Sequence, residues 1–131
     1  MLDTNTCIYI IKQKPPEVLQ RFTAFAVGDV TVASVTAAEL TYGAHKSQQV
    51  ARNLQAVEQF LLPLMVAEFD HPAARTYGRI RAHLEQRGTP IGSLDLLIAA
   101  HALALGVPLV TNNTREFARV PGLQTDNWAT S

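Results

Sequence analysis

The sequence lacks several features that mark whole classes of protein. Cys7 is its single cysteine, which excludes an intramolecular disulfide and a thiolate metal cage and leaves a buried thiol as the expectation. No apolar run reaches the roughly 20 residues that a membrane helix needs, and the N-terminus does not resemble a signal peptide. We therefore expect a single soluble, cytoplasmic domain over residues 1–131, with no membrane contact and a hydrophobic core of its own.

An excess of charge of one sign is also missing. Eleven Lys and Arg residues balance eleven Asp and Glu residues, so bulk charge does not bind this chain to nucleic acid. The four histidines form no HxxxH or HxH pair, which disfavours zinc and indicates surface or core positions. The motifs GxSxG, GxxxxGK[ST] and GxGxxG are absent. Serine hydrolase, phosphate-loop and dinucleotide-binding functions are therefore disfavoured.

The sequence does contain short β-branched segments that alternate with longer helical ones. Strands are predicted near residues 1–3, 30–34, 64–69, 108–110 and 123–125. Helices are predicted near residues 4–12, 16–22, 36–46, 54–61, 72–86 and 94–105. Strands that alternate with helices of this length indicate an α/β fold, in which helices cover both faces of a short parallel sheet of four to five strands.

Four acidic residues fall where strands lead into helices, which is the edge of a parallel sheet where ligands bind. Asp3 follows Met1 and Leu2, and Asp95 lies within the apolar segment SLDLLIAAHALAL. Carboxylates crowded in such surroundings repel one another and lose hydration, which raises their pKa unless a cation is present. Oxygen ligands suit Mg²⁺ or Mn²⁺. We therefore predict a metal site made by Asp3, Glu39, Asp95 and Glu116.

Each acid also has a structural explanation. Acidic side chains complement the helix dipole in any first turn, and Asp3 can cap a helix that begins near Thr4. The segment from Thr36 to Glu39 (TAAE) fits a capping box. A non-catalytic α/β binding module is therefore one alternative. A metal-dependent phosphatase or DNA nuclease is another, because the same ions serve related displacements.

Four segments together resemble a known family. They are MLDTN, ASVTAAELTYGAHKS, GTPIGSLDLLIAAHALALG and VTNNTREFARVPGLQTDNW, in order from Met1 to Trp128. As a set they resemble the PIN-domain ribonucleases, and within them the VapC toxins of bacterial toxin–antitoxin pairs. The resemblance implies a PIN-like three-layer sandwich, and it aligns Asp3, Glu39 and Asp95 with the metal-binding acids of that family.

The resemblance also bears on the residues around these acids. Glu116 precedes Phe117, where the family has a more variable acid that is usually Asp, so a water-mediated contact with the metal is the expected role of Glu116. Only Met1 and Leu2 precede Asp3, which implies a short first strand or a start further upstream. Polar residues that help to order the site in the family align with Thr4, Asn5, Thr111 and Asn112.

The activity implied by the resemblance is hydrolysis of RNA phosphodiester bonds with the help of one or two Mg²⁺ or Mn²⁺ ions. The expected products carry 5′-phosphate and 3′-hydroxyl ends, and transfer RNA is the expected target. The resemblance further implies a cognate VapB-like antitoxin, whose C-terminal segment blocks the carboxylate site, and a homodimer. Candidates for the apolar surface of these contacts are Ile10, Ile11, Phe60 and Leu61, and packing in the core explains these residues equally well.

RNA affinity requires a local basic patch, because the chain has no net charge. Arg75 and Arg79 are one helical turn apart and can share a face. Further candidates for RNA contact are Arg81, Arg87, Lys46 and Arg52, with Tyr42 and Tyr77 for stacking on bases. The alternative is that these arginines and lysines lie on solvated helix faces and that the tyrosines serve packing.

Overall fold

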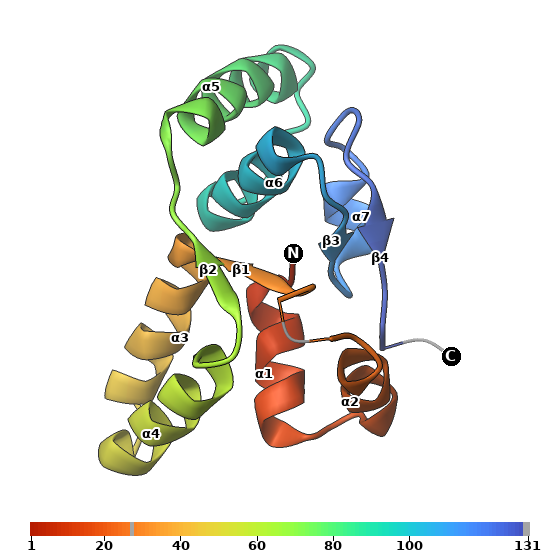
Figure 1. Cartoon of the computed structure of the whole chain (residues 1–131). Helices are drawn as coiled ribbons and strands as arrows, with labels where there is room; N and C mark the ends of the chain where they lie inside the picture. The colour runs from red at the N-terminus through yellow and green to blue at the C-terminus, as the bar shows by residue number, and fades with distance from the viewer. Residues whose placement is uncertain (27, 130–131) are drawn as a thin grey trace.

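The computed structural model describes residues 1–26 and 28–129 (Figure 1). The helices are α1 (Thr4–Lys12), α2 (Pro16–Thr23), α3 (Ser34–His45), α4 (Val50–Leu61), α5 (His71–Gln86), α6 (Ser93–Leu105) and α7 (Thr114–Phe117). The strands are β1 (Thr31–Ala33), β2 (Met65–Ala67), β3 (Leu109–Val110) and β4 (Thr125–Asp126). The predicted alternation is confirmed, and the one-turn helix α7 is the element that the sequence pattern did not predict.

The N-terminal segment lies at the centre of a parallel sheet. Leu2 forms parallel bridges to Val32 of β1 on one side and to Val110 of β3 on the other. The amide of Leu2 donates to the carbonyl of Thr31 at 3.0 Å, and the amide of Val110 donates to the carbonyl of Met1 at 2.8 Å. Since β1 pairs with β2 and β3 with β4, the order is β2, β1, N-terminal segment, β3, β4. The short first strand that we expected is therefore the middle of the sheet.

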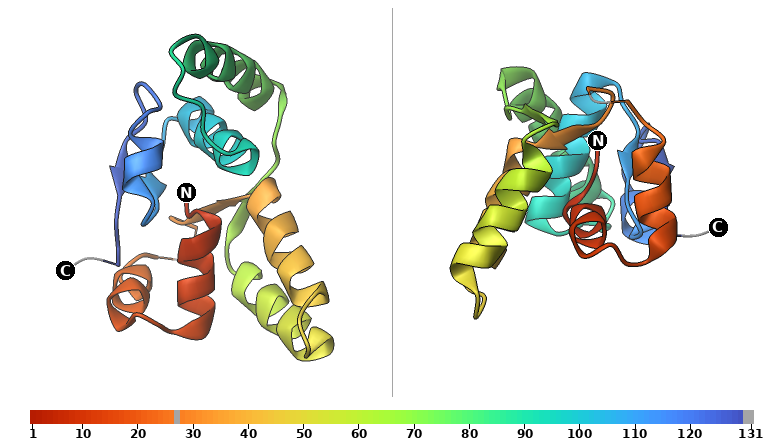
Figure 2. Two further views of the ribbon diagram at one scale, coloured as in Figure 1. Left: turned by 180° about the vertical axis from the view of Figure 1, so that it is seen from behind. Right: turned by 60° about the horizontal axis from the view of Figure 1, so that its bottom comes forward.

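Helices cover both faces of this sheet, because side chains alternate between the faces along each strand. Ala33 and Leu109 belong to a core cluster with residues of α5, α6 and α7. Val32 and Val110 belong to a second cluster with residues of α1, α2, α3 and α4. In Figures 1 and 2, α5 and α6 accordingly lie on the side of the sheet opposite to α1 and α2. The predicted three-layer sandwich is confirmed.

Side-chain caps explain where two of the helices begin. The carboxylate of Asp3 accepts the amide of Thr6 at 2.8 Å at the start of α1, as the structural explanation of this acid requires. The carboxylate of Asp70 accepts the amide of Ala73 at 3.1 Å at the start of α5. At the other end of a helix, Gly106 closes α6 with φ +70°, a backbone conformation that favours glycine.

The predicted capping box at Thr36 and Glu39 is wrong. Helix α3 begins at Ser34, with Ala33 as its N-cap and no side-chain hydrogen bond to its first turn. Thr36 is completely buried, and among the described residues its hydroxyl has no hydrogen-bond partner. Because the helix starts three residues earlier than the motif requires, Glu39 is free of capping and its side chain is used elsewhere.

The four apolar residues considered for intermolecular contacts pack in the core. Ile10 is buried, and Ile11, Phe60 and Leu61 are partly buried and pack against the second cluster. Packing in the core, the alternative explanation of these four residues, is therefore confirmed. Their helices, α1 and α4, must cover the sheet, and helical spacing directs the same side chains inward.

Two chemically active side chains are buried away from the solvent. Cys7 is a free thiol in α1, and burial raises its pKa well above the usual range, which keeps it protonated. His101 in α6 is 1% exposed and contacts the ring of Phe69 edge-on. Both positions agree with the core roles expected of them. Within the described part of the chain, no helix is long and apolar enough to cross a membrane.

Candidate metal centre

Three of the four predicted acids line one cavity of about 490 Å³ at the carboxyl edge of the sheet. Asp3 follows the central segment, Glu39 lies in the second turn of α3 after β1, and Asp95 lies in the first turn of α6. Parallel strands bring their carboxyl ends to one edge, so residues more than 90 positions apart meet there. The lining residues are Asp3, Thr4, Asn5, Glu39, Gly92, Ser93, Leu94 and Asp95.

Thr4 orients Glu39. The hydroxyl of Thr4 in the first turn of α1 donates to Oε1 of Glu39 at 3.0 Å. This bond joins two helices that leave neighbouring strands, and it leaves the other oxygen of Glu39 for the cavity. Asn5, the second predicted supporting residue of this turn, is exposed on the cavity wall.

Asp95 carries the electrostatic strain of the site. Burial, followed by the negative charges of Glu116, Asp3 and Glu39, raises the pKa of Asp95 to about 6. The carboxylates are therefore close enough to repel one another. Such repulsion is relieved by a cation between them, as the sequence argument anticipated.

Glu116 is held on both oxygens. Oε1 accepts the amide of Gly92 at 2.9 Å, and Oε2 accepts Nδ2 of Asn113 at 2.6 Å. The amide of Gly92 is the main reason that the pKa of Glu116 is lowered, and Asn113 and Arg119 act in the same direction. A Cβ placed on Gly92 would lie 3.8 Å from both Oδ2 of Asp95 and Oε1 of Glu116, so the two carboxylates flank this glycine.

Asn113 was missed by the sequence argument. It is the N-cap residue of α7, and the pattern Asn-x-x-Glu resembles the capping boxes formed by Ser or Thr, which is the signal that could have identified it. Thr111, which is fully buried, accepts the amide of Asn113 at 3.0 Å through its hydroxyl and so supports this loop. Asn112 is exposed and donates to the hydroxyl of Tyr9 at 2.7 Å, outside the cavity.

The donors of this cavity fit a hard divalent cation. They are carboxylate oxygens, with hydroxyl and amide oxygens from Thr4 and Asn5 beside them. Among the described residues, no three Asp, Glu, His or Cys side chains converge closely enough to hold one ion by themselves. Mg²⁺ is ordinarily held by one or two carboxylates, with water and substrate phosphate oxygens completing its shell. Asp3 and Asp95 are therefore the best-placed direct ligands, and Glu39 is the third candidate.

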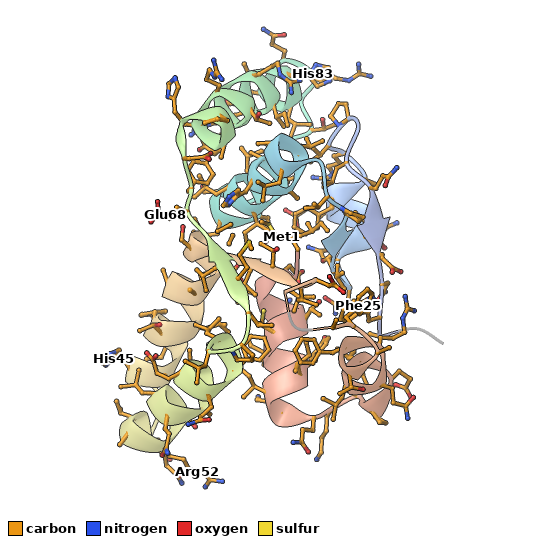
Figure 3. The ribbon with its side chains drawn as sticks, in the orientation of Figure 1. Met1, Phe25, His45, Arg52, Glu68 and His83 are labelled. Carbon is orange, nitrogen blue, oxygen red and sulfur yellow. The ribbon has the colours of Figure 1, made fainter. Side chains whose placement is uncertain are left out.

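The predicted basic residues do not form one patch. Lys46 and Arg52 lie at the free end of the α3–α4 hairpin, where Figure 3 labels His45 and Arg52, and the ammonium of Lys46 lies 5.1 Å from the ring centre of Tyr42. Neither lines the acidic cavity. The arginines of α5 lie on a helix that packs on α6, which carries Asp95. Arg75, Arg79 and Arg87 are exposed.

The fold and the site define an α/β domain with an acidic centre at the carboxyl edge of a parallel sheet. The family model of the PIN domain matches residues 1–123. The chain therefore belongs to the PIN domain family, and relatives at 49% and 47% identity over nearly its whole length place it among the VapC ribonucleases. The resemblance inferred from the sequence segments is confirmed.

Individual relatives match over almost the full chain. A tRNA(fMet)-specific endonuclease VapC from Shigella flexneri is 49% identical over 129 residues, covering 98% of this chain and 97% of the relative. The DNA-bound VapBC crystal structure from Salmonella typhimurium contains a chain with a TM-score of 0.92 and 47% identity, covering 98% and 96%. VapBC2 from Rickettsia felis, bound to a fragment of promoter DNA, gives a TM-score of 0.91 and 39% identity, covering 98% and 97%.

Proposed function

We propose that this protein is a toxin endoribonuclease that cleaves RNA with Mg²⁺ or Mn²⁺ held by Asp3 and Asp95, with Glu39 beside them. The observation that carries the proposal is the convergence of these three acids, from distant parts of the chain, on one cavity. Helix capping does not explain it, since neither Glu39 nor Asp95 caps its helix. The ribonuclease names of the relatives point to the same chemistry.

The residues around the cavity have separate tasks in this reaction. When bound, the divalent ion supplies a Lewis acid for the phosphate and lowers the pKa of a coordinated water. Asp3 and Asp95 would hold the ion, and Thr4 fixes the carboxylate of Glu39, which would orient the attacking water. Helix α6 starts at Ser93 with no side-chain cap, so the amides of its first turn are available to phosphate oxygens. Glu116 holds Gly92, and thereby the start of α6, in place.

The substrate class we propose is transfer RNA. The relatives from Shigella flexneri and Salmonella typhimurium are tRNA(fMet)-specific endonucleases, and they share 49% and 47% of their residues with this chain. A phosphatase or DNA nuclease with the same acids would act on other phosphates. Parallel assays on transfer RNA, single-stranded DNA and a phosphate monoester separate these activities.

The decisive experiment compares wild type and Asp95→Asn on transfer RNA in Mg²⁺ and in EDTA. We expect the wild type to produce 5′-phosphate and 3′-hydroxyl ends in Mg²⁺ and no product in EDTA. Asp95→Asn keeps the shape of the side chain and removes its charge, so it should be inactive. Cleavage that persists in EDTA, or full activity of the variant, would contradict the metal-dependent mechanism.

The proposed antitoxin has a groove to occupy. Helices α1, α3 and α4 enclose an apolar groove of about 330 Å³, which reaches the acidic cavity because Glu39 lines both. Its apolar walls include Ile8, Ile11, Leu40 and Val57. A segment with apolar side chains in the groove and a basic side chain at Glu39 would block the site. Three solved relatives are VapBC complexes, in agreement with such a partner.

A homodimer remains part of the proposal, with a different surface from the one first expected. The exposed apolar side chains Leu62, Met65 and Val66 lie on the edge strand β2 and just before it. An edge strand with such side chains invites pairing with another chain. Light scattering should give the mass of a dimer for the wild type and that of a monomer for Met65→Lys.

A further inference from the structure

A second cavity, of about 340 Å³, lies beside the acidic one. It is enclosed by α5, the segment that joins α5 to α6, and the first turns of α6. Its lining residues are Tyr77, Arg81, Leu84, Glu85, Pro90, Ile91, Ser93 and Leu96. No part of the metal-centred mechanism uses this cavity.

The two cavities meet at Ser93. This residue lines both of them, at the start of α6 and two positions before Asp95. The α5–α6 connection, which lines the second cavity, is held in place, because Arg119 donates to the carbonyl of Pro90 at 2.8 Å and ties the connection to the segment after α7. The α5–α6 connection runs beside that segment in Figures 1 and 2. A polymer with a phosphate in the acidic cavity would therefore reach the second cavity with an adjacent group.

The polar groups of the second cavity form one chain along α5. Nη1 of Arg81 donates to the hydroxyl of Tyr77 at 2.9 Å, and Nε of Arg81 donates to Oε1 of Glu85 at 3.1 Å. The guanidinium also lies 6.0 Å from the centre of the Tyr77 ring. Arg81 and Glu85 are both about half exposed at the mouth of the cavity, while Leu84 and Leu96 are buried behind them.

This combination of groups disfavours the binding of a phosphate and suits the binding of a nucleobase. The carboxylate of Glu85 repels a phosphate and offsets the charge of Arg81. A nucleobase presents donors and acceptors on its edge, which match a carboxylate that accepts and a guanidinium that donates. Its flat apolar faces suit the aliphatic wall and the aromatic ring of Tyr77.

We propose that this second cavity binds an unpaired nucleobase of the RNA, next to the phosphate that is held at Asp95. The inference rests on the proposed ribonuclease function and adds the contact by which the enzyme selects its cleavage position. Tyr77 and Arg81 are the specificity residues, with Glu85 as the acceptor for the base edge.

Binding is tested with two fluorescein-labelled strands of equal length, a single-stranded RNA and a ribose-phosphate strand without bases. Fluorescence anisotropy in EDTA gives the affinity for each strand while cleavage is stopped. The wild type should prefer the strand with bases by roughly tenfold, the effect of one well-placed base contact. Arg81→Ala and Tyr77→Leu should reduce this preference towards one. Since Tyr77 also packs against the core, Arg81→Ala, at an exposed side chain, is the variant least able to disturb folding.

Arg79→Ala is the matched control. This substitution also removes one positive charge, but from an exposed position of α5 that lines neither cavity. It should therefore weaken the binding of both strands by the same factor. The proposal would be overturned if Arg81→Ala and Tyr77→Leu kept the preference for the strand with bases, or if Arg79→Ala lost that preference to the same extent as Arg81→Ala. In Mg²⁺, Arg81→Ala should raise KM for RNA and keep kcat. A wild type that cleaves no RNA but keeps the base preference would refute the ribonuclease and leave the subsite standing. A wild type that cleaves RNA but shows no base preference would support the ribonuclease and refute the subsite.

Discussion

Glu116 and Asp95 flank Gly92, and Glu116 accepts the amide of this glycine at 2.9 Å. The second oxygen of Glu116 is held by Asn113 at 2.6 Å. An acid with both oxygens bound to the protein differs in role from one that faces the cavity. Glu116 therefore sets the position of the helix that carries Asp95, a role that differs from the water-mediated contact with the metal that we expected.

This relationship predicts graded effects on catalysis. Glu116→Gln keeps the acceptor for Gly92 and removes a charge, so activity should fall by roughly ten- to a hundredfold, as for groups that orient metal ligands. Asp95→Asn should be far more damaging, because it removes the charge that the ion requires. Steady-state cleavage of transfer RNA measures both, and equal losses would make Glu116 a ligand in its own right.

A second prediction separates capping from metal binding at Asp3. Asp3 and Asp70 each cap a helix through a backbone amide, and Asn caps about as well as Asp. Asp3→Asn and Asp70→Asn should therefore unfold at nearly the same temperature as the wild type. Only Asp3→Asn should lose activity, by roughly a hundredfold or more, since charged groups at a reacting centre contribute on that order. Full activity in Asp3→Asn would reduce Asp3 to a helix cap.

The third prediction concerns the metal and the folded state. A ligand that binds only the folded protein stabilises it, so millimolar Mn²⁺ should raise the melting temperature of the wild type by several degrees. Burial and three neighbouring acids raise the pKa of Asp95, so its ionised form is strained without metal. Asp95→Asn should melt no lower than the wild type in EDTA and should gain little from Mn²⁺. Calorimetry measures both shifts, and an undiminished gain would exclude Asp95 as a ligand.

The fourth prediction is a pH dependence of stability that originates at His101. Burial lowers the pKa of this histidine below its usual 6.5, although Asp70 and the backbone of Glu68 oppose the shift. The unfolded chain therefore takes up the proton first. The contribution of neutral His101 to stability is complete above pH 6.5 and is lost as the pH falls below that value.

His101→Leu removes this titration and nearly keeps the volume of the side chain. In EDTA, the melting temperature of the wild type should fall more between pH 7.5 and pH 5.5 than that of the variant. Asp95 has the opposite effect, because its raised pKa stabilises the folded state as the pH falls. Since Asp95 is present in both the wild type and His101→Leu, its effect cancels when the two are compared. If the melting temperatures of the two proteins fell equally with pH, the acid sensitivity would originate from other groups.

The fifth prediction tests the antitoxin groove. Gly43 of α3 lines it, and a Cβ at this position meets nothing within 4 Å, so a side chain can start here without a clash and a long one should occupy the groove. Gly43→Arg should cleave RNA like the wild type and resist neutralisation by the antitoxin. Gly78→Arg is the matched control, since Gly78 of α5 also faces open space and lies outside the groove. Equal neutralisation of the two variants would place the antitoxin elsewhere.

The sequence by itself determined the alternation of strands and helices, because hydrophobic spacing, prolines and glycines act over a few neighbouring residues. That alternation also placed Asp3, Glu39 and Asp95 at strand ends, and parallel pairing then brings such ends to one edge. The cap at Asp3 was predictable for the same local reason. The family could be inferred as well, from four short segments in their order along the chain.

Only the tertiary structure decided which oxygens of these acids are free. Glu39 is bound by Thr4, 35 residues away, and Glu116 by Gly92, 24 residues away, and no local pattern encodes either contact. Burial is equally non-local: Ile10 is a core residue because α1 packs on the sheet. The base-sized cavity beside Ser93 likewise exists only because α5 packs across α6. Hydrogen bonds and packing between distant segments, which no window of sequence contains, decide how the acids are used.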